Sequence, residues 1–319
     1  MGKLTFGVFP LGLAGSPDGV AVGPPDDFTK VAEAAVELQG DGPMLLPRMY
    51  VSWSGPRGTG DALRQIDALT TQSMPWDLVL CYRDRSGSVA KWAEFAATVV
   101  REHGRHLAAV QVTGEANLAG IAAAADGDYP GVRQALVCGV LAAAEAKRAS
   151  GAAAAIGFAV APEVDPAATG FWTEVRNLGG SDFAGALDYA GIDAYPDVFG
   201  PRFGVDKIPM AMDWILRTFR ERDLAGAGID AGVPIRICEN GWPTGPDRPE
   251  ETQADVLEAV IRTTAALSDE LNVTHWELFT LRDADTSRDG MFYHFGILRD
   301  DYSRKPAFGR LRALIGELS

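Results

Sequence analysis

Short apolar runs alternate with longer amphipathic stretches along the chain. The short runs are rich in β-branched and other apolar residues, which favours buried strands, and the longer stretches repeat apolar residues at helical spacing. Eight strands are expected, at residues 5–9, 45–51, 78–82, 109–113, 155–160, 190–194, 235–238 and 276–280. Helices are expected at residues 27–38, 89–102, 131–149, 212–222, 251–267 and 307–318. Strands separated by helices in this way predict parallel pairing.

Eight such repeats indicate the α/β class and a single (β/α)8 TIM barrel, with residues 1–319 forming one catalytic domain. An open, doubly wound sheet is the alternative, but its Gly-rich phosphate turn is missing after the first strand, where Pro10 interrupts the segment 7–12. Residues 120–128 and 162–170 are rich in Gly, Ala, Asp or Pro and are expected to be loops. Both follow strands, so a barrel would place them at its C-terminal end, where this fold carries its chemistry.

Composition narrows the range of partners. The chain of 319 residues has a formal net charge of −14, and such a field repels nucleic acids and anionic membrane surfaces. No apolar run is long enough to span a membrane, and the first residues lack the pattern of a secretory signal, so we expect a cytoplasmic location. The three cysteines show no disulfide or zinc spacing, which agrees with a reducing compartment.

Three predicted strands carry a charge at or near their ends. Glu115 follows the fourth strand and Glu239 follows the seventh, while Arg48 lies within the second. In a barrel, Glu115 and Glu239 would therefore face each other across the mouth. Glycoside cleavage requires two such carboxyls, one to protonate the leaving oxygen and one to attack the anomeric carbon or activate water. A neighbouring cation, for which Arg48 is the candidate, would keep the nucleophile ionised.

These segments resemble clan A of the glycoside hydrolases, which are retaining (β/α)8 enzymes. Glu239 in Cys-Glu-Asn-Gly-Trp-Pro-Thr is similar to the clan's nucleophile segment on strand 7, and Glu115 in Gly-Glu-Ala-Asn to its acid/base segment on strand 4. The resemblance implies that Arg48 and Tyr195 approach the nucleophile, and it extends to the tail at residues 295–308. Two departures concern the sugar subsite: Gly114 replaces the clan's Asn, and the Trp near the end of strand 8 is displaced.

Further residues are candidates for substrate contact. Trp53, Trp172 and Trp242 follow predicted strands and are candidates for stacking on sugars. Asn117, Glu163, Phe279 and Asp283 occupy strand ends or the loops after them. Other interpretations remain open: Glu239 could cap a turn, Glu115 could begin a helix, Tyr195 could be a core residue, and Asp283 could belong to a solvated loop held by ion pairs.

The resulting prediction is a hydrolase that cleaves β-linked glycosides by double displacement, with Glu239 as nucleophile and Glu115 as acid/base. Their carboxyls should lie about 5 to 5.5 Å apart, as in retaining enzymes. The expected partner is a carbohydrate substrate, and no cofactor or metal is implied. Two alternatives are a silent carbohydrate-binding barrel and a metal-dependent barrel enzyme, although the mouth lacks an obvious set of metal ligands. Gly114 suggests a sugar with an unusual 2-substituent.

Overall fold

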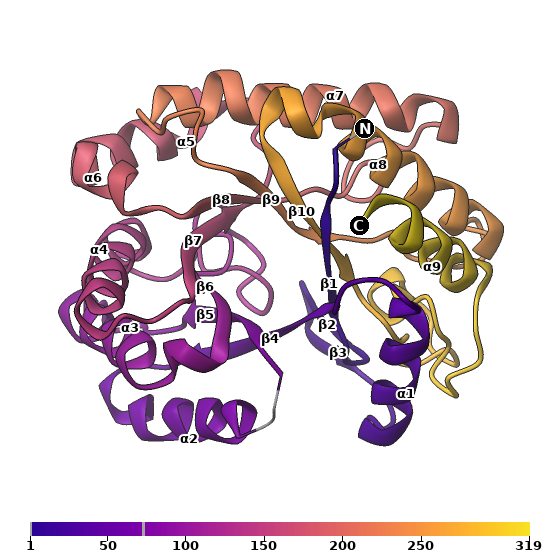
Figure 1. Cartoon of the computed structure of the whole chain (residues 1–319), viewed down its shortest axis with the longest axis horizontal. Coiled ribbons are helices and arrows are strands. Elements are labelled where there is room, and N and C mark those ends of the chain that lie inside the picture. Colours follow the sequence, from indigo (N-terminus) through magenta and orange to yellow (C-terminus); the bar gives the residue numbers. More distant parts are fainter. Residues whose placement is uncertain (1, 72–73) are drawn as a thin grey trace. The chain divides into compact units, whose positions relative to one another are not determined.

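A computed structural model describes residues 2–71 and 74–319 and contains a closed eight-stranded barrel. The strands neighbour one another in the order β1, β10, β9, β8, β7, β6, β5, β4 (Figure 1). The parallel pairs include β1 with β10 and β4 with β5. The prediction of a (β/α)8 barrel is confirmed, and the open doubly wound sheet is excluded. The barrel strands are β1 (Thr5–Phe9), β4 (Leu46–Trp53), β5 (Trp76–Tyr82), β6 (Leu107–Val112), β7 (Ala155–Val160), β8 (Tyr189–Asp193), β9 (Ile235–Asn240) and β10 (Val273–Phe279).

Every predicted strand coincides with one of these barrel strands, with shifts of a few residues at the ends. The all-apolar character of most runs explains this agreement, because parallel strands are covered on both faces. In β5, for example, all seven residues are buried. One shift concerns the site: β9 extends to Asn240, so Glu239 belongs to the strand and does not follow it.

The six predicted helices are also present. Two of their boundaries, the start of α1 and the end of α4, have recognisable capping residues. The side chain of Asp27 accepts hydrogen bonds from the first backbone N–H groups of α1, and Gly151 ends α4 in the left-handed conformation. The helices are α1 (Phe28–Gln39), α2 (Thr59–Thr70), α3 (Val89–His103), α4 (Val132–Ser150), α5 (Pro166–Thr169), α6 (Phe171–Ala186), α7 (Ile208–Arg217), α8 (Glu250–Leu271) and α9 (Pro306–Leu318). A π-helical segment, Thr218–Leu224, continues α7. Among the described residues, no helix has the length and apolar character needed to cross a membrane.

Several elements were not predicted. The helices α2 and α6 follow the second and fifth barrel strands, and the short helix α5 lies inside the expected loop at residues 162–170. After β1 comes a hairpin, β2 (Leu13–Ser16) with β3 (Gly19–Val22), whose strands are only four residues long. The two hairpin strands and α5, with four residues each, give too few repeats for a period to be recognised.

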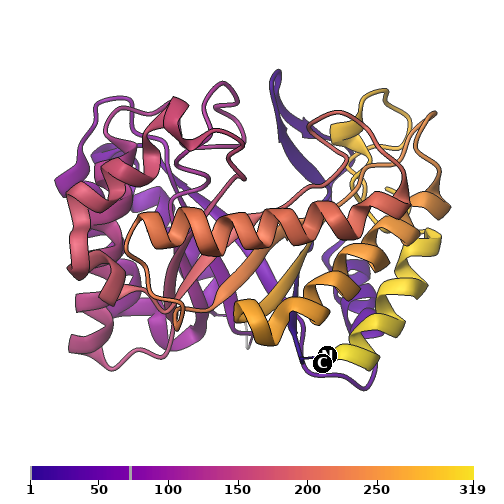
Figure 2. The ribbon, with the colours of Figure 1, turned by 90° about the horizontal axis from the view of Figure 1, so that it is seen from above.

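By internal packing the chain divides into two compact units. Unit 1 comprises Met1–Leu45, Asp193–Arg217 and Arg236–Ser319, and unit 2 comprises Leu46–Ile192 and Thr218–Ile235. In unit 1 the two chain ends lie side by side (Figure 2), where the Leu4 N–H donates to the Leu318 carbonyl. The β2–β3 hairpin lies at the opposite end of the same unit. Whether residues 1–319 behave as one domain stays a prediction.

Candidate functional site

In unit 1, the backbone around Glu239 is held by contacts with Ala194, the residue after β8. The Ala194 N–H donates to the Glu239 carbonyl over 2.9 Å, and the Asn240 side-chain amide donates to the Ala194 carbonyl. Asn240 itself is 1% exposed. The backbone on both sides of the Glu239 side chain is therefore fixed by interactions that do not depend on a ligand.

The Glu239 carboxylate also has a side-chain partner. The Tyr195 hydroxyl, two residues beyond the end of β8, donates to Glu239 Oε2 over 2.8 Å. The Tyr195 ring packs edge-on against Phe279 and Phe295, with centroids 6.4 and 5.9 Å away. This contact between Tyr195 and Glu239 is the one that the resemblance implied, and it orients one oxygen of the carboxylate.

In unit 2, Glu115 lies three residues beyond the end of β6, in an unusual backbone conformation. Thr113 and Glu115 have φ angles of +69° and +43°, a left-handed region that side-chain-bearing residues rarely adopt. The Leu118 N–H donates to the Glu115 carbonyl, which closes a turn. Such a conformation persists only where the surroundings impose it.

Asp126 supplies much of that constraint. Its Oδ2 accepts the backbone N–H groups of Gly114 and Tyr82, each over 2.7 Å, and its Oδ1 lies 3.0 Å from Arg83 Nε. The residue is fully buried. Burial raises the pKa of Asp126 to about 7, although Arg83 and the two N–H donors act in the opposite direction. Asp126 thus connects the loop of Glu115 to the end of β5.

Arg83 holds the loop at residues 120–128 through hydrogen bonds to its backbone. Its guanidinium donates to the carbonyls of Ala124 and Ala125 and also to that of Ala122, and it lies 5.4 Å from the Tyr129 ring centroid. Residues 120–128 form the loop expected from the sequence, whereas the roles of Arg83 and Asp126 were not predicted. An Arg directly after an apolar strand was the available signal, whereas nothing local distinguished Asp126 from its exposed neighbour Asp128.

Arg48 is buried at the interior of unit 2. Its Nη2 donates to Gln111 Oε1 over 2.6 Å, its Nε donates to the Tyr50 hydroxyl, and Asp77 lies 3.7 Å away. Gln111 in turn donates to the Thr113 carbonyl over 3.0 Å. A hydrogen-bonded chain therefore runs from β4 to Thr113, two residues before Glu115. An approach of Arg48 to Glu239 stays a prediction.

The Asn117 amide is occupied by the backbone. It donates to the Ala161 carbonyl over 2.8 Å and accepts the Ala161 N–H over 3.0 Å, so it joins the loops after β6 and β7. Asn117 therefore has a structural role, and its contact with substrate stays a prediction. Glu163, in the second of these loops, is buried and accepts the Thr169 hydroxyl. Burial raises the pKa of Glu163.

The predicted stacking role of the tryptophans is wrong, because their rings are buried. Trp53 and Trp242 are 0% exposed, and Trp172 is 5% exposed. Trp53 packs among aromatic rings of unit 2 and donates to Thr59. Trp242 donates to Asp197 Oδ2 over 3.1 Å. Rings buried to this degree present no face on which a sugar could stack.

Asp283 is likewise a structural residue and does not belong to a solvated loop. It is 1% exposed and pairs with the buried ammonium of Lys305 over 2.8 Å. Lys305 also donates to Thr244, while Asp283 accepts the Gly296 N–H. Burial raises the pKa of Asp283 to about 6, against the effect of Lys305. The network joins the loops after β9 and β10 to the start of α9.

Contact of Phe279 with substrate stays a prediction. Phe279 ends β10, is partly exposed, and stacks on Phe9 with ring centroids 5.3 Å apart. Its peptide bond to Thr280 is cis. Its ring also packs edge-on against Tyr195, whose hydroxyl donates to Glu239, so Phe279 contacts a neighbour of the carboxylate.

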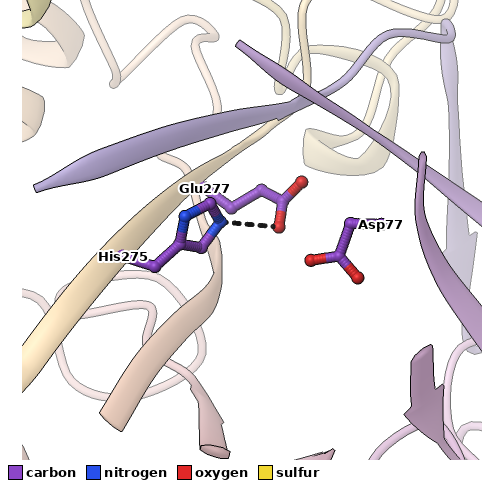
Figure 3. A group of neighbouring side chains, drawn as sticks. All are labelled: Asp77, His275 and Glu277. Carbon is purple, nitrogen blue, oxygen red and sulfur yellow. Dashed lines mark hydrogen bonds and ion pairs between the residues drawn. The ribbon is translucent and has the colours of Figure 1, made fainter. Parts of the chain in front are cut away.

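Two buried polar residues of β10 were missed. His275 and Glu277 alternate with apolar neighbours and so point to the same side of the strand. Both are 0% exposed, and His275 Nε2 lies 3.3 Å from Glu277 Oε2 (Figure 3). The second ring nitrogen of His275 contacts the Thr5 hydroxyl over 2.8 Å. The pattern His-x-Glu within an apolar run was the available signal.

Comparison with known proteins supports the fold. No family model matches the chain, and no curated protein matches it. Among solved structures it is similar to a β-glucosidase from Exiguobacterium marinum, with 14% identity, 98% of each chain covered and a TM-score of 0.64. It is also similar to a Thermotoga maritima β-glucosidase in complex with deoxynojirimycin, with 15% identity, 100% of each chain covered and a TM-score of 0.64. A β-glucuronidase from an uncultured Clostridium sp. matches 99% of this chain with 50% of its own, at 12% identity and a TM-score of 0.61.

Proposed function

We propose that the chain is a retaining glycoside hydrolase that cleaves β-linked glycosides, with Glu239 as the nucleophile. The observation that carries this proposal is the hydrogen bond from the Tyr195 hydroxyl to Glu239 Oε2 at the C-terminal end of β9. In barrel enzymes this end of the strands holds the reacting groups. The likeness to solved β-glucosidases supports the same reaction class.

Glu115 is the proposed acid/base. In the first step a Glu239 oxygen bonds to the anomeric carbon while the glycosidic C–O bond breaks, and Glu115 gives its proton to the departing oxygen. In the second step Glu115 takes a proton from water, whose oxygen displaces Glu239 from the anomeric carbon. The products are the free sugar with retained configuration and the alcohol, and both carboxyls return to their starting states.

Gly114 bears on which sugar is accepted. A Cβ atom at this position would meet Cys81 Sγ, Asp126 Oδ2 and the Ala124 carbonyl at 3.7 to 3.9 Å, which are ordinary contacts. The position therefore has room for a Cβ atom, so the backbone does not require glycine here. The absence of the clan's Asn supports the proposal of a sugar whose 2-position differs from a plain hydroxyl, because that Asn hydrogen-bonds to the hydroxyl.

The decisive experiment is to trap the glycosyl intermediate. The protein would be incubated with a panel of activated 2-deoxy-2-fluoro β-glycosides, and intact mass spectrometry followed by peptide mapping would locate the adduct. We expect one added glycosyl unit on the peptide containing Glu239, none in Glu239→Gln, and an unchanged adduct in Glu251→Gln, an exposed residue at the start of α8.

Other outcomes distinguish the alternatives. An adduct on Glu115 would reverse the two roles. Neither adduct nor turnover, combined with measurable sugar binding, would identify a carbohydrate-binding barrel without activity. Turnover that disappears with a chelator and returns with a divalent metal ion would favour the metal-dependent alternative.

A further inference from the structure

Unit 1 presents two phenylalanines from the loops that follow β8 and β10. Phe199 is 55% exposed, and Phe292 is partly exposed. Their rings are stacked, with centroids 6.2 Å apart and planes inclined by 24°. We call this pair the Phe199–Phe292 platform.

The platform is continuous with the surroundings of Glu239. Phe199 packs edge-on against Tyr195, whose hydroxyl holds the Glu239 carboxylate, with ring centroids 5.2 Å apart. Phe295 lies beneath both platform rings, at 6.3 Å from each, and also contacts Tyr195. A set of aromatic contacts therefore leads from Tyr195, which holds the carboxylate, to the exposed residue Phe199.

The loop that carries Phe199 is anchored by buried charges. Asp197 is 5% exposed and accepts both the Trp242 indole N–H and the Phe203 N–H, so it fixes the two ends of this segment. Arg248 donates to the Asp197 carbonyl over 2.9 Å. The buried Trp242 thus helps to fix the loop of Phe199 through its hydrogen bond to Asp197.

The loop that carries Phe292 is fixed as well. The 3-10 turn Met291–Tyr293 packs against the β2–β3 hairpin, and the Tyr293 carbonyl accepts the Ala284 N–H. Directly after the turn, the His294 carbonyl accepts the Thr244 N–H over 3.0 Å. A preformed apolar surface loses little entropy when a ligand covers it, which favours binding.

We infer that the Phe199–Phe292 platform binds an aromatic ring of the substrate's leaving group, so that the protein selects aryl-bearing β-glycosides. This inference rests on the proposed function. The two side chains carry no hydrogen-bonding atom, so they cannot distinguish the hydroxyl pattern of a second sugar. They can, however, stack on a planar apolar group.

The test compares leaving groups of similar acidity that differ only in the presence of a ring. For each sugar of the trapping panel, kcat/KM is measured with the 2-phenylethyl and n-butyl β-glycosides, for the unmodified protein, Phe199→Ala and Phe292→Ala. We expect each substitution to lower kcat/KM for the 2-phenylethyl glycoside about three- to tenfold and to change that of the butyl glycoside less than twofold. Phe199→Tyr should keep the preference.

Phe28→Ala is the matched control, since Phe28 is 70% exposed on α1 and outside the platform. Equal losses on both glycosides, or no loss on either, would overturn the inference. Binding of the two glycosides to Glu239→Gln, measured by calorimetry, separates this inference from the proposed function. A preference for the 2-phenylethyl compound that Phe199→Ala removes would support the platform even in a protein without turnover, and equal affinities would refute it.

Discussion

The two candidate carboxylates are positioned in different ways. Glu239 lies inside β9, where its own carbonyl accepts the Ala194 N–H and the Tyr195 hydroxyl donates to its side chain. Glu115 lies in a turn beyond β6, where its φ of +43° is imposed by a loop. That loop is held by Asp126, a buried carboxylate in contact with Gly114 and Arg83.

This difference predicts how far each carboxylate should move when one of its neighbouring contacts is removed. A strand position is fixed by many backbone hydrogen bonds, so the loss of one side-chain contact should reorient Glu239 only slightly. A strained turn depends on a few specific groups, so the loss of Asp126 should release Glu115.

The largest effect is expected from Glu115→Ala. Loss of the proton donor should lower kcat/KM about 10²- to 10⁴-fold on glycosides with alkyl leaving groups, and far less on those with acidic phenols, which leave without protonation. Azide should restore turnover of the activated substrates and yield the β-glycosyl azide. Glu102→Ala, at an exposed position of α3, is the control. A uniform loss on all leaving groups would contradict the acid/base assignment.

Asp126→Asn should have the next largest effect on activity. Misplacement of Glu115 should reduce kcat on alkyl glycosides about ten- to a hundredfold, with a smaller change for acidic leaving groups. The protein should also lose about 1 to 3 kcal/mol of stability, because an amide cannot satisfy two backbone N–H groups and Arg83 together. Asp128→Asn, which alters an exposed residue of the same loop, should change neither quantity by much.

The same variant has a defined pH signature. The folded-state pKa of Asp126, about 7, lies above its ordinary value of 3.8, so the folded protein holds this proton more tightly than the unfolded chain. The stability that Asp126 contributes is therefore largest in acid and declines as pH rises from about 4 to about 7. Denaturant titrations of both proteins should show their difference shrinking over that range, whereas a constant difference would contradict this account.

The smallest effect is expected from Tyr195→Phe. Removal of one hydrogen bond to a carboxylate should lower kcat about tenfold and leave the position of Glu239 in the strand unchanged. The loss should be similar for all leaving groups, because it affects the nucleophile. Tyr302→Phe, which removes a hydroxyl that accepts the Asp27 N–H elsewhere in unit 1, serves as control. Dependence on the leaving group would mean that Tyr195 assists Glu115 instead.

The sequence by itself determined the barrel and the place of both carboxyls along it. Eight apolar runs separated by helical repeats are compatible with few folds other than a barrel. The position of Glu239 directly after the apolar run that ends at Cys238 identified it as a candidate site residue from local pattern alone. The candidate pair Tyr195 and Glu239 also came from the sequence, and the structure brings the two into contact.

Only the tertiary structure decided which polar residues hold these groups in place. Asp126, twelve residues beyond Gly114, is indistinguishable in sequence from Asp128, yet one is buried and the other exposed. By its place after a strand, Trp242 was a candidate for stacking on a sugar, but its side chain is fully buried. Phe199, which no sequence pattern indicated, is exposed instead. Burial and long-range hydrogen bonding arise from segments that meet only when the chain is folded, so no local period or spacing encodes them.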